Sequence, residues 1–135
     1  VLEKLEGKRI LLAEDNDLNA EITTTILENE GLLIDRAADG VQCMDQINQM
    51  PAGTYDLILM DIQMPVMNGY EATANIRAGE SDYWKTIPVI AMTANVFQED
   101  ESRAAECGMS DYVTKPIDMN VIYSVLEKWL RGQKG

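Results

Sequence analysis

Five short apolar runs divide the chain, and each one precedes a stretch with helical spacing. The runs cover residues 10–13, 32–37, 57–60, 89–92 and, more weakly, 112–113. Apolar runs of this length are typical of strands that are buried on both faces of a sheet. The pattern therefore predicts five strands with a helix after each.

The helical stretches differ in the strength of their apolar stripes. Clear stripes follow the first, second and last runs: Leu18, Ile22 and Ile26; Val41, Met44 and Ile47; and Ile122, Leu126 and Leu130. Stripes of this spacing are typical of amphipathic helices. The third and fourth helices have weaker stripes and are expected to begin near Gly69 and Gln98.

Strands that alternate with helices indicate parallel pairing with right-handed crossovers. We therefore expect a doubly wound α/β fold in which five helices cover both faces of a five-stranded parallel sheet. All 135 residues are expected to form one domain with a core over about 8–130. The segment 77–88 is less regular, and its Tyr83 and Trp84 are interpreted as a small satellite core rather than as an exposed aromatic contact.

Composition narrows the classes of partner and of chemistry. The net charge of −12 argues against direct contact with nucleic acid, whose phosphates are bound mainly by Lys and Arg. No apolar run approaches the ~20 residues of a membrane span, and no signal-peptide pattern opens the chain. Cys43 and Cys107 are expected to be buried, reduced thiols. These features predict a cytoplasmic protein without membrane insertion.

Histidine is absent, so any chemistry must use carboxylates, hydroxyls and lysine. Such residues follow every predicted strand except the second, at the end where ligands bind in open parallel sheets. They are Glu14 and Asp15, Asp61, Thr93 and Lys115.

Each of these residues also has a purely structural interpretation. Asp15 could cap the first helix, Asp61 could form a turn, Thr93 could simply end a strand, and Lys115 could be a solvated charge. An acid directly after a buried run, however, costs desolvation energy unless it is paired. The topology would also bring all of these residues to one edge of the sheet.

Three carboxylates gathered at one edge would repel each other. At ~5 Å and an effective dielectric near 20, each pair costs roughly 3 kcal/mol. Lys115 offsets only part of this repulsion, so the set favours a hard divalent cation such as Mg²⁺. A carboxylate beside such an ion can attack phosphorus, which makes Asp61 a candidate acceptor, with Thr93 and Lys115 binding the phosphoryl oxygens.

At this point the chain resembles the receiver domain of two-component response regulators. The stretches "ILLAEDN", "LILMDIQMPVMNGYEA", "IPVIAMTA" and "YVTKPID" appear in that family's order and at its spacing. The "EDNxxN" form, with Asn16 and Asn19, is most similar to receivers of hybrid sensor histidine kinases. The resemblance implies a flavodoxin-like fold with strand order 2-1-3-4-5.

The resemblance also implies residue roles. Asp61 would be the phosphoacceptor, and the implied Mg²⁺ ligands are Asp15, Asp61, the backbone carbonyl of Gln63, and Glu14 through water. Thr93 and Tyr112 would form the switch, although Tyr112 could equally be a half-buried tyrosine at the sheet edge. Lys115 would bind the phosphoryl group.

Several loop details follow from the same resemblance. Pro65 and Asn68-Gly69 suit a tight loop below the acceptor, in which Gly69 would supply backbone freedom. Lys115-Pro116 is expected to be a cis peptide. Glu14 stands where many receivers have Asp, and Gln63 and Asn95 flank the phosphate site, so the lifetime of the phosphoryl group stays open.

The resulting hypothesis is Mg²⁺-dependent phosphoryl transfer from a phosphohistidine to Asp61. The donor would be a histidine kinase or a histidine phosphotransfer protein, and Leu18 and Ile22 are a candidate docking surface if they are not core. Phosphorylation would switch a surface around the fourth helix, fifth strand and fifth helix. The domain would assist its own phosphorylation without turning over a free substrate.

The parent chain is expected to be a hybrid kinase, with a stand-alone phosphorelay receiver as the alternative. If the parent kinase is bound to a membrane, it would tether this cytoplasmic domain there. A phosphorylation-dependent dimer stays open. Among rival functions, a haloacid-dehalogenase-type phosphatase would use Asp15-x-Asp17, but Leu18 departs from that family's motif. A flavin carrier would need Ser, Thr and Gly where acids follow the first strand. A degenerate docking module is disfavoured by the intact Asp61, Thr93 and Lys115.

Overall fold

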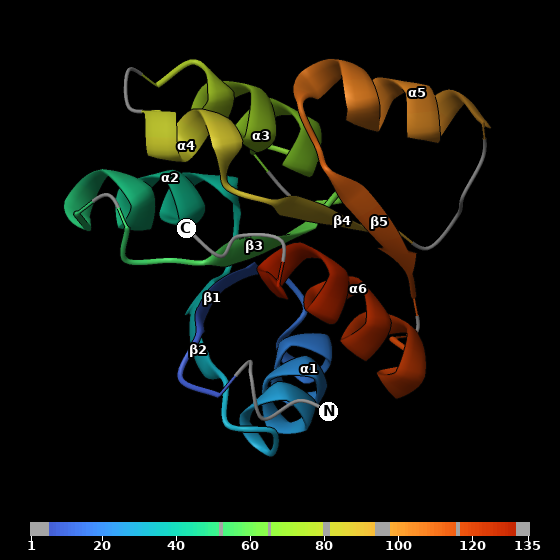
Figure 1. Cartoon of the computed structure of the whole chain (residues 1–135). Coiled ribbons are helices and arrows are strands. Elements are labelled where there is room, and N and C mark those ends of the chain that lie inside the picture. The colour runs from blue at the N-terminus through green and yellow to red at the C-terminus, as the bar shows by residue number, and fades with distance from the viewer. Residues whose placement is uncertain are drawn as a thin grey trace.

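Five parallel strands form one sheet in the order β2-β1-β3-β4-β5 (Figure 1). The computed structural model describes residues 6–51, 53–64, 66–79, 82–93, 98–115 and 117–131. The strands are β1 (Arg9–Ala13), β2 (Leu33–Ala37), β3 (Leu57–Asp61), β4 (Val89–Thr93) and β5 (Asp111–Thr114). The predicted fold class, parallel pairing and strand order are confirmed.

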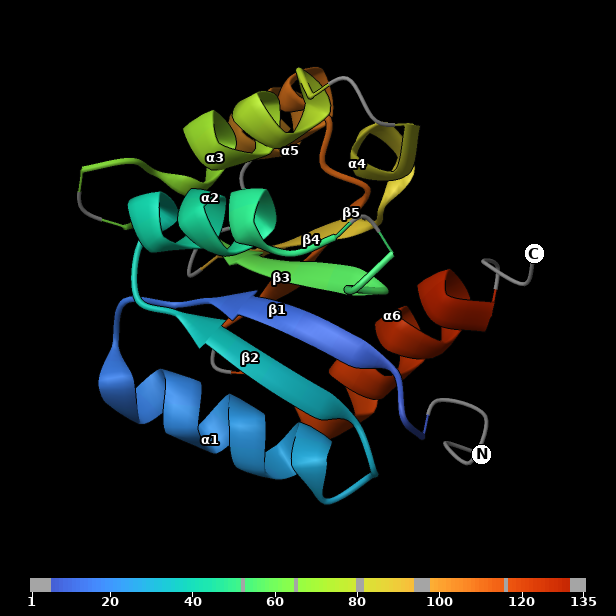
Figure 2. The same ribbon diagram turned by 90° about the vertical axis from the view of Figure 1, so that its left-hand side faces the viewer.

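Helices cover both faces of the sheet, as predicted (Figure 2). They are α1 (Asp17–Glu28), α2 (Gly40–Gln49), α3 (Gly69–Arg77), α4 (Asp82–Thr86), α5 (Gln98–Cys107) and α6 (Met119–Arg131). One apolar cluster joins the sheet to α1 and α6, and a second joins it to α2, α3, α4 and α5. The predicted starts of α3 and α5, at Gly69 and Gln98, are confirmed.

The expected number of five helices is wrong, because the described residues include the additional short helix α4. It spans five residues, too few to show an apolar stripe in the sequence. The rings of Tyr83 and Trp84 meet edge to face at 4.6 Å and pack against the core. The Arg77 Nη1 atom also donates a hydrogen bond of 3.0 Å to the Trp84 carbonyl. The interpretation of these aromatics as a satellite core is thus confirmed.

The central strands are apolar because both of their faces are covered. All five residues of β3 are buried, and β1 and β4 have four buried residues each. The register pairs Ala13 with Met60 and Asp61 with Met92. The residue that follows β1 therefore lies beside the last residue of β3.

Helix α1 buries only part of its predicted apolar stripe, since Ile26 packs against the core. Leu18 and Ile22 are 64% and 47% exposed, whereas Ala20, Thr23 and Leu27 are buried. The interpretation of Leu18 and Ile22 as wholly core is therefore wrong. In α6, by contrast, the predicted stripe of Ile122, Leu126 and Leu130 is buried.

The amino end of the sheet is fixed by polar contacts. Arg9 Nη1 lies 2.9 Å from Asp35 Oδ1, and the Tyr55 hydroxyl donates to Asp35 Oδ2 at 2.9 Å. Asp56 accepts a hydrogen bond of 2.9 Å from the Arg9 backbone N–H. The turn from α2 to β3 at this end contains exposed Gly53, with φ of +94° and open space where a side chain would lie.

Two further expectations concern thiols and membranes. Both cysteines are free; Cys43 is buried, as expected, whereas Cys107 is only partly buried. Burial raises the pKa of the Cys43 thiol to about 12. None of the helices in the described part of the chain has the length and apolar character needed to cross a bilayer.

Candidate functional site

Three acidic residues converge at the carboxyl end of the sheet. Glu14 and Asp15 follow β1, and Asp61 ends β3, so the register of the two strands brings them together. Glu14 and Asp61 are only 1% and 3% exposed, whereas Asp15 is exposed. One carboxylate oxygen of each residue lies within 4.8 Å of the others, a spacing that could hold a metal ion.

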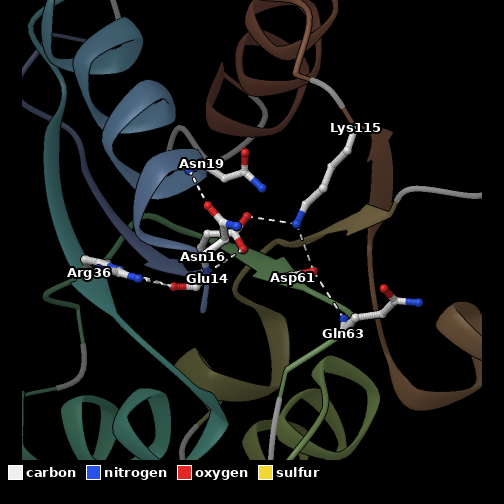
Figure 3. A network of polar contacts seen from close by, with 7 residues as sticks. All are labelled: Glu14, Asn16, Asn19, Arg36, Asp61, Gln63 and Lys115. Carbon is white, nitrogen blue, oxygen red and sulfur yellow. Dashed lines mark hydrogen bonds and ion pairs between the residues drawn. The ribbon is translucent and has the colours of Figure 1, made fainter.

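Lys115 reaches this cluster from the residue that follows β5. Its Nζ atom lies 2.8 Å from Glu14 Oε1 and 3.1 Å from Asp61 Oδ1 (Figure 3). The Lys115 backbone N–H donates to the Thr93 carbonyl at 2.7 Å, which fixes the start of the side chain at the end of β4. The ammonium group therefore bridges the two buried carboxylates.

Burial and mutual repulsion change the acidity of the buried groups. Burial, followed by the neighbouring Glu14, raises the pKa of Asp61 to about 7. Burial also acts to raise the pKa of Glu14, but hydrogen bonds with Asp61 and Lys115 outweigh it, so this pKa lies below its usual value. Burial acts to lower the pKa of Lys115, but Glu14 and Asp61 outweigh it and raise that pKa. The cluster therefore has an excess of negative charge that a divalent cation with oxygen ligands would balance.

Backbone N–H groups orient the two buried carboxylates. The Gln63 N–H donates to Asp61 Oδ1 at 3.2 Å, and the Asn16 N–H donates to Glu14 Oε2 at 3.2 Å. The Gln63 side chain is exposed and extends away from Asp61 (Figure 3). That the Gln63 carbonyl binds a metal stays a prediction.

Asp15 and Asn16, which lie between β1 and α1, have different roles. Asn16, not Asp15, caps the helix, because its side chain accepts a hydrogen bond of 2.9 Å from the Asn19 N–H. The interpretation of Asp15 as a helix cap is therefore wrong. Its carboxylate lies with the acidic cluster instead.

Gly69 is required for a reason other than the predicted one. Its φ is not positive, so backbone freedom is not the explanation. A Cβ at this position would clash with the Asp61 carbonyl oxygen and lie 2.9 Å from Ile62 Cα. Close packing of α3 against the residue after β3 is what needs glycine. Among the described residues of this loop, Val66 is the one with positive φ, at 67°.

The predicted switch residues lie on the last two strands of the sheet, β4 next to β3 and β5 at the edge. Thr93 is the last residue of β4, is partly buried, and is in register with Thr114. Tyr112 lies on the edge strand β5 and is 38% exposed. Their switching roles stay predictions. The expectations for Pro65, Asn95 and the Lys115-Pro116 peptide fall outside the described residues.

Arg36 is a site residue that the sequence pattern did not reveal. It lies on β2, the strand to which no site residue was assigned, and its Nε and Nη2 atoms donate to the Glu14 carbonyl at 3.1 and 2.8 Å. Its Nη1 atom lies 2.8 Å from Asp17 Oδ1. The available signal was a pair of charged residues, Asp35 and Arg36, within a strand whose other residues are apolar.

A hollow of about 90 Å³ lies beside the cluster, between α1 and the segment after β5. Its lining residues are Glu14, Asn19, Ile22, Thr23, Lys115 and Ile117. The exposed side of α1 therefore continues directly into the acidic cluster. A partner that contacts Ile22 would approach Lys115 as well.

Comparison with known proteins gives consistent matches. The response regulator receiver domain family matches residues 10–127. Over 121 residues, 88% of this chain, the sequence is 41% identical to hybrid signal transduction histidine kinase I of Dictyostelium discoideum. Histidine kinase 1 of Arabidopsis thaliana is 38% identical over 152 aligned positions, which cover 90% of this chain. The matched parts are only 7% and 13% of those proteins, so this chain spans a small fraction of their length.

Solved structures agree in fold. The receiver domain of a sensor histidine kinase from Pseudomonas aeruginosa, crystallised with a magnesium ion coordinated in its active site cleft, is 37% identical, with a TM-score of 0.82. The match covers 93% of this chain and 98% of that one. A chemotaxis protein of Vibrio cholerae has a TM-score of 0.83 at 22% identity, covering 91% of this chain and 98% of its own, which supports the fold alone.

Proposed function

This chain belongs to the response regulator receiver domain family, and we propose from this premise that Asp61 is the residue that accepts its phosphoryl group. The observation that carries the proposal is the contact of Lys115 with both buried acids, at 2.8 and 3.1 Å. The ammonium group of Lys115, and a cation held by the carboxylates, would neutralise the negative charge of a phosphoryl group at Asp61. Phosphoryl transfer depends mainly on neutralisation and positioning.

In the proposed reaction, a carboxylate oxygen of Asp61 attacks the phosphorus of a phosphohistidine in line with the leaving nitrogen. The new P–O bond forms as the P–N bond breaks, and the released imidazole takes up a proton. Asp15 and Asp61, with the Gln63 carbonyl and with Glu14 through water, would hold Mg²⁺, which supplies positive charge to the phosphoryl oxygens. The acidic spacing of 4.8 Å supports this assignment.

Lys115 and Thr93 would then bind the transferred group. Lys115 already contacts the acceptor carboxylate, and Thr93 ends the adjacent strand. Movement of Thr93 toward the phosphoryl group would leave space for Tyr112, and this change would alter the surface of α5, β5 and α6. These are the elements expected as the fourth helix, fifth strand and fifth helix, since α4 shifts the helix numbering.

The proposed partner is a histidine kinase or a histidine phosphotransfer protein. Its docking surface would include Leu18 and Ile22, which are exposed on α1 beside the hollow that leads to Lys115. An apolar contact next to a strongly acidic centre suits a partner that presents an apolar helix face around its phosphohistidine. We also propose a hybrid histidine kinase as the parent protein, because the curated relatives are of that kind. A cytoplasmic location stays a prediction. Dimerisation on phosphorylation stays a prediction.

Measurement of intact mass after incubation with Mg²⁺ and a small phosphodonor tests the assignment. We expect one added phosphoryl group in the wild type and none in Asp61→Asn. Asp45→Asn, which removes an exposed acid from α2, is the matched control and should be phosphorylated normally. Phosphorylation of Asp61→Asn would contradict the proposal, and multiple turnover of a phosphate monoester would favour the phosphatase alternative.

A further inference from the structure

We propose that Arg36 is a positioning residue that orients Asp15 for metal binding by holding the peptide group between Glu14 and Asp15. The inference rests on the proposed function, because orientation of Asp15 matters only if the acidic cluster binds Mg²⁺. It concerns an arginine on the edge strand β2, which does not itself contact the cluster of carboxylate oxygens.

The guanidinium group of Arg36 binds the loop after β1 through three nitrogen atoms. Nε and Nη2 donate to the Glu14 carbonyl at 3.1 and 2.8 Å, and Nη1 forms an ion pair of 2.8 Å with Asp17. In Figure 3, Arg36 approaches the Glu14 backbone from the side opposite Lys115. The planar fork of arginine is suited to this arrangement because it presents several donors in a fixed geometry.

Asp15 needs such support because its side chain has none of its own. Within the described parts of the chain, the Asp15 carboxylate makes no hydrogen bond or ion pair. Glu14, by contrast, is held by Lys115 and by the Asn16 N–H. The direction of the Asp15 side chain therefore depends on its backbone.

Strand β2 fixes that backbone at both polar atoms of the preceding residue. The Glu14 N–H donates to the Ala37 carbonyl at 3.0 Å, and the Glu14 carbonyl accepts from Arg36. Because a peptide group is planar, fixing the Glu14 carbonyl also fixes the Asp15 nitrogen. Arg36 thereby sets the orientation from which the Asp15 side chain leaves the main chain.

Positioning and charge predict opposite effects when Arg36 is replaced. A positive charge near a cation site opposes cation binding, so its removal alone would strengthen Mg²⁺ binding. Loss of the hydrogen bonds that orient a ligand weakens metal binding, typically by 10- to 100-fold. The sign of the change in Kd therefore separates the two roles.

The test is calorimetric titration of the wild type, Arg36→Gln and Arg36→Lys with Mg²⁺. We expect the Kd to rise about tenfold in Arg36→Gln. Arg36→Lys keeps the charge but lacks the forked guanidinium group, so this variant should also bind Mg²⁺ more weakly than the wild type. If Arg36→Gln fails to fold, Arg36→Lys provides the test.

Arg9→Gln is the matched control. Arg9 lies on the adjacent strand, forms an ion pair of 2.9 Å with Asp35, and is at the other end of the sheet. Its replacement removes the same charge and should change the Mg²⁺ Kd by less than about twofold. Thermal unfolding without metal should show similar losses of stability in Arg36→Gln and Arg9→Gln.

Phosphorylation kinetics supply a second readout. Arg36→Gln should be slow at low Mg²⁺ and recover the wild-type rate at saturating Mg²⁺. An unchanged or tighter Kd in Arg36→Gln, beside normal binding by the wild type, would overturn this inference and leave the proposed function intact. A rate that stays low at saturating Mg²⁺ would also overturn it. Absence of Mg²⁺ binding in the wild type would count against both the positioning role of Arg36 and the proposed function.

Discussion

The raised pKa of Asp61 makes the stability of the folded protein depend on pH. The pKa of about 7 reflects burial and the negative charge of Glu14. The folded protein therefore retains a proton on Asp61 at pH values where the unfolded chain has lost it. Between about pH 4 and pH 7, this group makes the folded state less favourable as pH rises.

Asp61→Asn removes this unfavourable contribution. We expect the metal-free variant to be more stable than the wild type at pH 8. The difference in unfolding free energy between the variant and the wild type should be larger at pH 8 than at pH 4, by on the order of 1–3 kcal/mol. Urea unfolding at both pH values, in the presence of a chelator, measures this difference. If the difference in unfolding free energy between Asp61→Asn and the wild type does not change with pH, the raised pKa of Asp61 is contradicted.

The close packing of Gly69 against Asp61 and Ile62 leads to a prediction about stability. Gly69→Ala places a methyl group against the Asp61 carbonyl and Ile62 Cα, so we expect a loss of about 1–3 kcal/mol in unfolding free energy. Because the strained atoms belong to Asp61, the phosphorylation rate should fall too. Gly79→Ala, near the other end of α3, brings its nearest neighbour to 3.2 Å and is the milder control. Equal losses in the two variants would argue against a specific constraint at position 69.

At the scale of elements, periodicity predicted where helices lie better than which side they bury. The stripe of α6 is the buried side, because its large residues Ile122, Leu126 and Leu130 fill the space against the sheet. In α1 the predicted stripe is divided, because Ile26 packs against the core whereas Leu18 and Ile22 are exposed. Ala20 and Thr23 are buried instead, and a pattern of large apolar residues does not reveal positions occupied by alanine and threonine.

The exposed stripe of α1 makes a prediction about partner binding. We expect Leu18→Gln with Ile22→Gln to slow phosphotransfer from a phosphohistidine protein about tenfold, as for loss of an interface anchor. Phosphorylation by a small phosphodonor should be unchanged, since neither side chain contacts Asp61. Stopped-flow or gel-based transfer assays measure both rates.

Two controls separate docking from folding in that experiment. Val41→Gln replaces an exposed apolar residue on α2 and should leave transfer unchanged. Leu27→Ala removes a buried residue of α1 and should cost about 2–5 kcal/mol of stability. Wild-type transfer in the double variant would exclude α1 as the docking surface.

At the scale of the whole molecule, parallel topology accounts for how much of the candidate site could be predicted. The order β2-β1-β3-β4-β5 brings the ends of β1, β3, β4 and β5 to one edge of the sheet. Convergence of Glu14, Asp61 and Lys115 follows from that order. The contribution of Arg36 depends on a side chain that reaches back to a neighbouring loop, which strand order alone does not predict.

Binding of Mg²⁺ should stabilise the whole fold. At 100 times the Kd, the added stability is about 2.7 kcal/mol, which raises the Tm by several degrees. Because protonation of Asp61 competes with the metal, the increase should be larger at pH 8 than at pH 5.5. Differential scanning calorimetry at matched ionic strength measures it. An equal increase in Asp61→Asn would indicate general screening of the net charge of −12 rather than a specific site.

The exposed turn at Gly53 has a practical consequence. It connects α2 to β3 at the amino end of the sheet, away from the carboxylates, and a Cβ placed on Gly53 would meet no atom within 4 Å. An affinity tag or surface tether inserted directly after Gly53, with the glycine kept because of its positive φ, would leave the reactive edge accessible. The same turn is therefore the natural point at which to immobilise the protein for binding measurements.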